Sequence, residues 1–189
     1  VREALRRICA ENATVDDTEI IYTDAESYAD LLYSLCEKLK ISVTFSEGMS
    51  SYMTSAGRAM MGFLLWVKED FNEIYLRHVF ESSGLEWESS QKADMPGGST
   101  LAFLLRTSGI GWGRGRYAAV LDGQILKSKQ IAADLRKEGE GEDAERKETK
   151  TRDLAILREI CEGLLKLVPP KDKADKIDFG KFCEGCVVF

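Results

Sequence analysis

The stretch from Glu19 to Trp66 constrains the fold more than any other, because the period of its apolar residues changes twice. The β-branched and aromatic run Ile20–Tyr22 predicts a short strand. A capping box at Thr23–Glu26 opens a predicted helix that closes at Lys40. Alternation of apolar and polar residues over Ile41–Ser46 then predicts a second strand. Strand, helix and strand together predict a small βαβ-like unit.

Helical spacing dominates the rest of the chain. A turn at Glu47–Gly48 leads into the next helix, and a second capping box lies at Asp70–Glu73. The glycine- and proline-containing segment Ser82–Gly98 is predicted to be a loop. The charged run 137–150 is predicted to be a linker or a helix extension. Helices are predicted over 1–9, 59–67, 71–81, 99–105, 120–135 and 151–168, the last ended by Pro169 and Pro170.

Composition narrows the functional classes. The net charge of -6 differs from that of a dedicated nucleic-acid module, which is usually basic, so any DNA contact must come from a local patch. No apolar run approaches the roughly 18 residues of a membrane span. Five cysteines, an odd number, are typical of free thiols in a reducing compartment, and we therefore expect a cytoplasmic protein.

The glycine-rich segment 108–117 is the strongest candidate for a binding site. A helix, Gly-Ile-Gly and a second helix give the outline of a helix-hairpin-helix. Glycines let backbone N–H groups approach a phosphate, and the helix that follows adds a favourable dipole. Arg114 and Arg116 supply positive charge. The alternative is a C-cap glycine in a tight turn between two packed helices.

Four segments of the chain together resemble a known family. These are Ile20–Asp24, Ile41–Gly48, Thr54–Ala59 and the run Gly109–Tyr117. They resemble the second RecA-like domain and inserted 2B subdomain of UvrD-type superfamily 1 helicases. The resemblance is closest to the helicase-like part of the B subunits of bacterial helicase–nucleases of the AddB and RexB type, and it covers roughly residues 15 to 125.

The resemblance implies an α+β, predominantly α fold. A βαβ-like RecA remnant would occupy 1–50 and pack on a helical 2B-like region over 51–136 with the helix-hairpin-helix-like element. A charged linker (137–150) and an amphipathic helix with a tail (151–189) would follow. We expect the chain to be part of a longer protein, an ATP-dependent DNA helicase and exonuclease with a PD-(D/E)XK nuclease domain.

The resemblance also implies a non-catalytic role in DNA repair and recombination, with no cofactor in this segment. The expected partners are duplex or forked DNA, the remaining domains of the parent chain and a helicase–nuclease partner subunit. The expected DNA-binding residues are Gly109, Gly111, Trp112, Gly113, Arg114 and Arg116, with Arg58 as a weaker candidate. The alternative is a protein-interaction scaffold that never touches DNA. A basic patch made by Arg114, Arg116 and the nearby Lys127 and Lys129 would favour DNA, whereas burial of those arginines against Asp or Glu would favour the scaffold.

Other chemistries have weaker sequence support. No G-x-x-x-x-G-K-[ST] motif is present, so we expect no ATP hydrolysis by this segment. The triplets Glu145–Lys147 and Glu148–Lys150 match a nuclease motif literally, but they lie in a polar run. The pair Cys183 and Cys186 supplies two ligands where a structural zinc needs four, and we predict no metal site. His78, the only histidine, is predicted to pack in the core or at an interface. Trp66 and Trp112, two of the three tryptophans, could stack on bases, but the residues alone favour core packing for both.

Overall fold

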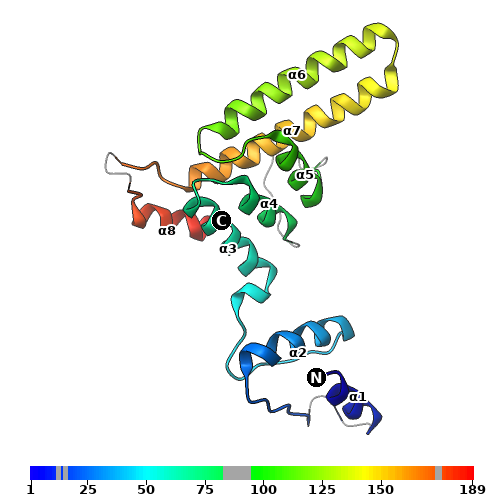
Figure 1. Ribbon diagram of the computed structural model, residues 1–189, viewed down its shortest axis with the longest axis vertical. Helices are drawn as coiled ribbons and strands as arrows, with labels where there is room; N and C mark the ends of the chain where they lie inside the picture. The colour runs from blue at the N-terminus through cyan, green and yellow to red at the C-terminus, as the bar shows by residue number, and fades with distance from the viewer. Residues whose placement is uncertain (12–13, 15–16, 83–94, 173–175) are drawn as a thin grey trace. The chain divides into compact units, whose positions relative to one another are not determined.

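The computed structural model describes residues 1–11, 14, 17–82, 95–172 and 176–189. The chain forms two compact units, Val1–Met53 and Thr54–Phe189, whereas the sequence predicted a boundary between 50 and 51. Eight α-helices and a short 3-10 helix, and no strands, occur among the described residues (Figure 1). The predominantly helical class is therefore confirmed, and the βαβ-like unit is not supported.

The first unit is built on two helices. α1 (Arg2–Ala10) and α2 (Ala25–Leu39) contribute Leu5, Leu32 and Cys36 to a small buried cluster. The 3-10 turn η2 (Ser51–Met53) ends the unit. α2 begins at Ala25, and the backbone N–H of Tyr28 donates to the carbonyl of Asp24 at 3.2 Å.

The two predicted strands are extended segments without a sheet. In both, half-buried and exposed residues alternate, and the half-buried ones pack on the small cluster: Ile20, Tyr22, Ile41, Val43 and Phe45. The backbone of Ile41 donates back to the carbonyl of Cys36 at 2.9 Å and ends α2. Within the described residues the backbones of 19–22 and 42–44 form no such bond, so the period of two reflects packing without strand pairing.

The second unit contains the main core. α3 (Ser55–Lys68), α4 (Glu73–Glu81) and α5 (Gly98–Ser108) surround the fully buried side chains of Phe63 and Trp66. The apolar periods predicted these three helices, but the cap of α4 differs. Asn72, not Asp70, accepts a bond from the N–H of Ile74 at 3.1 Å, because Asp70 has a left-handed backbone with φ 49.

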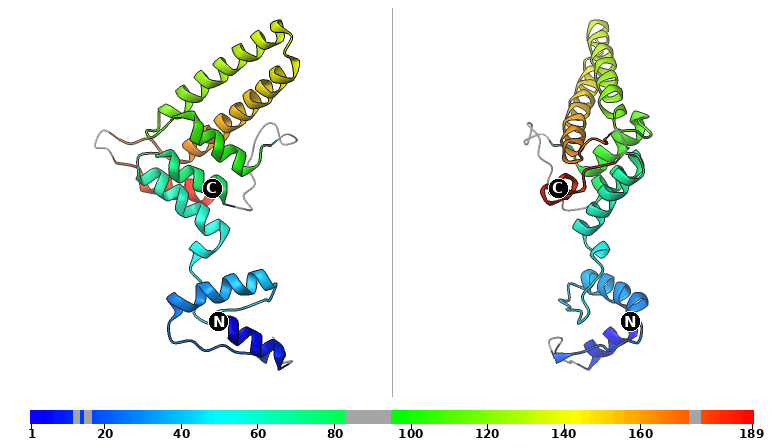
Figure 2. Two further views of the ribbon diagram at one scale, coloured as in Figure 1. Left: turned by 45° about the vertical axis from the view of Figure 1, so that its right-hand side comes forward. Right: turned by 90° about the vertical axis from the view of Figure 1, so that its left-hand side faces the viewer.

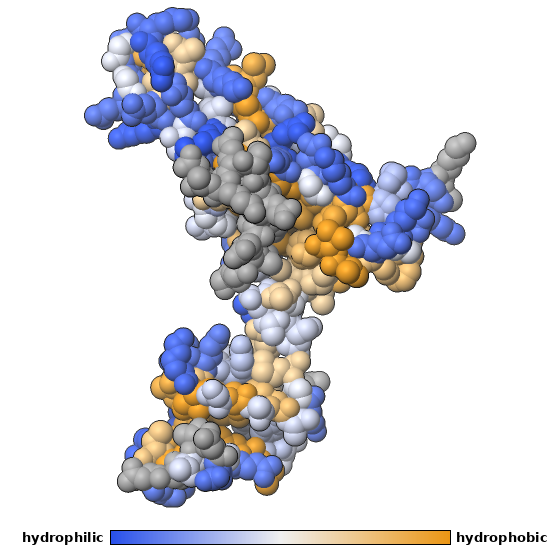
Figure 3. Space-filling view, turned by 180° about the vertical axis from the view of Figure 1, so that it is seen from behind, coloured by the Kyte–Doolittle hydropathy of each residue, from blue (hydrophilic) through white to orange (hydrophobic). Residues whose placement is uncertain are grey.

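α6 (Arg116–Glu138) and α7 (Gly141–Leu167) form a long antiparallel hairpin (Figure 2). Their contact uses small residues, and the hydroxyl of Thr151 donates to that of Ser128 at 2.8 Å. Gly139, at φ 84, makes the turn. Residues 137–150, predicted as a linker or a helix extension, thus form the ends of both helices. This end of the hairpin is mostly hydrophilic (Figure 3).

α8 (Phe179–Val188) packs beside the end of α7. The Cβ of an alanine at Gly185 would lie 2.0 Å from the carbonyl oxygen of Leu167, so only glycine permits this approach. The predicted loop over 82–98 falls largely outside the described residues. Among the described helices, none has the length and apolar character that crossing a bilayer requires.

Candidate nucleic-acid interface

The loop 109–115 joins α5 to α6 and is shaped by glycine. Gly109 ends α5 in the left-handed region with φ 74, and Gly111 and Gly113 follow with φ 71 and 95. Other residue types adopt these angles only with strain. The side chain of Ile110 between them is completely buried and anchors the loop in the core.

The segment 70–73 forms two backbone hydrogen bonds with the loop. The N–H of Glu73 donates to the carbonyl of Gly111 at 2.8 Å, and the N–H of Gly113 donates to the carbonyl of Asp70 at 2.7 Å. Asp70 and Phe71 themselves have positive φ values of 49 and 58. The two irregular segments therefore brace each other through their backbones.

Arg114 fastens the loop to the end of α7. Its guanidinium donates to the carbonyls of Leu165 and Val168 at 2.7 Å each and to that of Pro169 at 3.1 Å. It also lies over the ring of Phe71, 5.6 Å from the ring centre. Burial lowers the pKa of this guanidinium. The side chain satisfies the C-terminal carbonyls of a helix, where a cation is favoured.

Two linked, buried hydrogen bonds join α3 and the start of α6 to the segment 70–73, which holds the loop. The indole N–H of Trp66 donates to the hydroxyl of Tyr117 at 2.7 Å, and this hydroxyl donates to the carbonyl of Phe71 at 2.7 Å. Burial raises the pKa of Tyr117, so the hydroxyl stays protonated. These two hydrogen bonds could not be predicted from the sequence, because the residues that they join are 51 and 46 residues apart.

The exposed residues of the loop are Gly109, Trp112 and Gly115, and Arg116 at the start of α6 is exposed beside them. Trp112 is 61% exposed, in contrast to its predicted packing. Gly115 caps α6 with no side-chain bond. The N–H of Arg116 donates to the carbonyl of Gly113 at 3.1 Å, and the N–H groups that follow it in the first turn have no side-chain acceptor among the described residues. The guanidinium of Arg116 donates to the carbonyl of Gly109 at 3.3 Å and pairs with no carboxylate of the described residues.

The other expected cations are placed differently. Lys127 follows Arg116 by three helical turns on the same side of α6, and both Lys127 and Lys129 are exposed. Arg58 lies in the first turn of α3, about 15 Å along that helix from the end near the loop. Arg58 is therefore not brought into the loop.

Carboxylates also surround the loop. Glu69 and Asp70 are exposed beside it. The carboxylate of Glu73 pairs with Arg77 at 2.9 Å, and its side chain is only 16% exposed. Burial raises the pKa of Glu73, while Arg77 and Arg106 act in the opposite direction. Carboxylates and cations therefore both lie around the loop.

The remaining candidates do not assemble into sites. His78 was predicted to pack in the core or at an interface; it is exposed, so the core placement is wrong, and its Nδ1 lies 3.8 Å from a carboxylate oxygen of Glu81. Both nuclease-like triplets lie on α7, and Glu148 pairs with Arg136 at 2.9 Å. Cys183 and Cys186 lie one turn apart on α8, and burial, with a smaller contribution from Cys183, raises the pKa of Cys186. The described part of the chain holds no cluster of three or more potential metal ligands.

Models of protein families, curated proteins and solved structures offer no match to this chain. The resemblance to the helicases therefore stays a prediction from the sequence, and the case for function depends on the geometry of the loop.

Proposed function

We propose that the second unit contacts the backbone of duplex DNA through the exposed part of the loop 109–116, without catalysis. As the resemblance implies, it would act within an ATP-dependent helicase–nuclease of DNA repair and recombination, beside the other domains of that protein and a partner subunit. The phosphate-binding groups would be Arg116, the N–H groups at the start of α6, and Lys127 further along the helix.

One observation carries this proposal: hydrogen bonds hold the loop in place on two sides, yet Arg116 beside it remains exposed to solvent. Arg114 is committed to α7, and Gly111 and Gly113 are bonded to the segment 70–73. The same contacts leave Arg116 without a carboxylate and the start of α6 without a side-chain cap. Preorganised N–H groups and an unpaired cation favour an anion such as phosphate.

Docking to a protein is the second candidate, and it is favoured by the exposed apolar side chains of Trp112 and Ile74. They are 61% and 43% exposed, and each directly follows one of the two residues joined by the bond between Gly111 and Glu73. An exposed tryptophan beside an aliphatic side chain is typical of protein interfaces. In this reading DNA is never contacted.

The test measures binding of the whole chain to a fork with a duplex arm and a single-stranded arm, across a salt series. Arg116→Ala is compared with Arg146→Ala, which removes the same charge from an exposed site near the hairpin end. Arg114 is left intact, because its loss would disturb the loop itself. We expect Arg116→Ala to weaken binding about threefold to tenfold and to lower the salt slope by about one, and Arg146→Ala to do neither.

No binding at low salt, in a chain shown by circular dichroism to be folded, would refute the DNA contact. Equal losses for Arg116→Ala and Arg146→Ala would mean that attraction is not localised to the loop, which also contradicts the proposal. Affinity that is independent of salt but lost on Trp112→Ala would indicate an apolar contact instead.

A further inference from the structure

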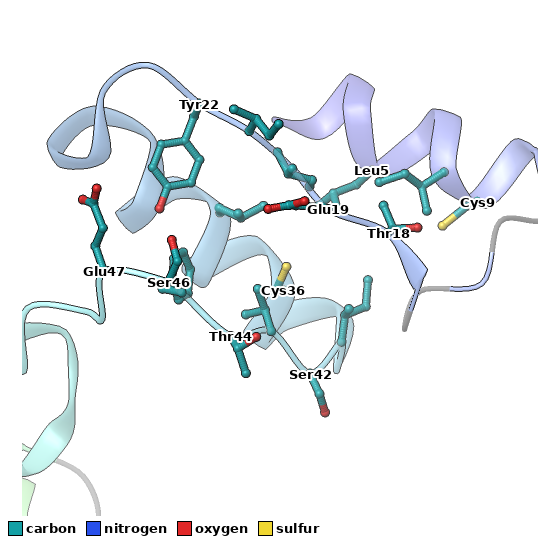
Figure 4. Close-up of a pocket in the computed structure, with 17 residues that line it drawn as sticks. Leu5, Cys9, Thr18, Glu19, Tyr22, Cys36, Ser42, Thr44, Ser46 and Glu47 are labelled. Carbon is teal, nitrogen blue, oxygen red and sulfur yellow. The ribbon is translucent and has the colours of Figure 1, made fainter.

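The first unit contains a groove that the proposed DNA contact does not use. It has a volume of about 740 Å³, and it lies between the extended segments 18–22 and 41–47, with Leu32 and Cys36 of α2 also lining it. In Figure 4 the segment with Thr18, Glu19 and Tyr22 runs along one side, and the segment with Ser42, Thr44 and Ser46 along the other. Both segments run in the same direction.

The two segments have the character of strands without a partner. Half-buried and exposed side chains alternate along each. In the described part of the chain, the N–H and C=O groups of 19–22 and 42–44 bond to no other backbone group. Two parallel extended segments with unpaired backbones on either side of a groove are the two neighbours of a vacant strand position.

The size of the groove fits one short strand. With strands about 4.8 Å apart, layers about 10 Å apart and a rise of about 3.3 Å, one strand residue occupies about 160 Å³. A groove of about 740 Å³ therefore has room for roughly four to five residues. The flanking segments, 18–22 and 41–47, are long enough to pair with a strand of that length.

The charged residues that line the groove indicate which side chains a bound segment should carry at its ends. Glu19 and Glu47 line the groove, and both are exposed. No lysine, arginine or histidine of the described residues lines it. Hydrophobic residues also reach the surface of this unit (Figure 3). The complementary occupant carries alternating apolar residues and a cation at each end.

We infer that the first unit binds an extended segment of a separate protein as an added β-strand. The segment has four to five residues with alternating apolar side chains, pairs with the backbones of 19–22 and 42–44, and places lysine or arginine near Glu19 and Glu47. This inference does not depend on the loop of the second unit. Strand addition of this kind takes its affinity from main-chain bonds and its specificity from alternate side chains.

A seven-residue peptide with lysine at each end and alternating valine and threonine between them tests the inference on the whole chain. Saturating peptide should slow amide hydrogen exchange at least about tenfold at alternate residues of 19–22 and 42–44, because only the N–H groups that face the added strand gain acceptors. The same peptide with methylated backbone nitrogens should give no protection. Absent protection, or equal binding of the methylated peptide, would overturn strand addition.

Charge reversal supplies an independent test that leaves the core intact. The variant E19K/E47K should bind the lysine-ended peptide about tenfold more weakly and should bind a glutamate-ended version more tightly. The matched variant E11K/E37K reverses two exposed charges outside the groove and should change neither affinity. Equal losses in both variants would overturn the assigned charge pairing. Protection that grows with protein concentration in the absence of peptide would show that a second copy fills the groove, and would overturn a separate partner.

Discussion

Arg114→Ala should destabilise the second unit markedly, although arginine is usually a surface residue. The guanidinium makes three bonds to the carbonyls of Leu165, Val168 and Pro169 and covers the ring of Phe71. Truncation removes the only side-chain donor that these carbonyls have among the described residues. The loss therefore affects both the loop and the C-terminal end of α7.

The expected magnitude follows from these contacts. A hydrogen bond to a charged group contributes about 1.5–3 kcal/mol, but the site is only partly buried and the freed carbonyls can bind water. A total of about 2–4 kcal/mol is reasonable for all three bonds together with the lost ring contact. For a unit of this size, 1 kcal/mol shifts Tm by roughly 3–4 °C, so we expect a decrease of about 6–15 °C.

Urea denaturation followed by circular dichroism gives the measurement, and Arg116→Ala gives the control. Arg116 is exposed, and its guanidinium donates to the carbonyl of Gly109 at 3.3 Å and to no carboxylate of the described residues, so its loss should cost less than about 0.5 kcal/mol. Arg114→Lys should fall between the two, because a lysine amine reaches fewer of the carbonyls. Equal stability of the Arg114→Ala and Arg116→Ala variants would refute the anchoring role.

Three further predictions concern other parts of the structure. Gly185→Ala should weaken the packing of α8, seen as faster amide exchange in 179–188, since its Cβ would lie 2.0 Å from the Leu167 carbonyl oxygen; Gly180→Ala, whose Cβ would lie 3.5 Å from a carboxylate oxygen of Asp178, should leave exchange unchanged. Tyr117→Phe should lower the free energy of unfolding by about 2–3 kcal/mol, because two buried groups lose their partner, and normal stability by urea denaturation would contradict this. Burial raises the pKa of the Cys161 thiol, so its thiolate is scarcer at any given pH; at pH 8 it should react with a thiol reagent far more slowly than exposed Cys183, and equal rates would contradict its burial.

The helices were largely predictable, because each buries one apolar stripe. Leu154, Leu157, Cys161 and Leu164 lie on the buried side of α7, as their spacing predicts. The period of the apolar residues does not specify where a helix ends within a run of charged residues. The hydrophilic run 137–150 has little apolar signal, yet it continues both helices, because Ala132 and Ala144 let the backbones approach closely.

The two predicted strands show what an alternating pattern does not specify, namely whether an extended segment pairs with another. Alternation correctly identified which side chains of 41–45 would turn inward, because that depends only on an extended backbone. Pairing depends in addition on a neighbouring strand, and the described chain offers none to 19–22 or 42–44. A pattern of period two is thus evidence for an extended segment, and evidence for a sheet only when a partner is present.

The different roles of the two arginines near the glycine-rich loop could be seen only in the structure. Arg114 and Arg116 lie two residues apart, and composition and spacing treat them alike. Only one is anchored, because the end of α7 presents three carbonyls to Arg114, and backbone carbonyls some 50 residues away leave no mark in the sequence. The alternative of a tight turn between packed helices therefore describes Arg114 well. The phosphate-binding hypothesis then depends on Arg116 and the uncapped start of α6, so a mutation of both arginines together would confuse loss of binding with loss of the loop.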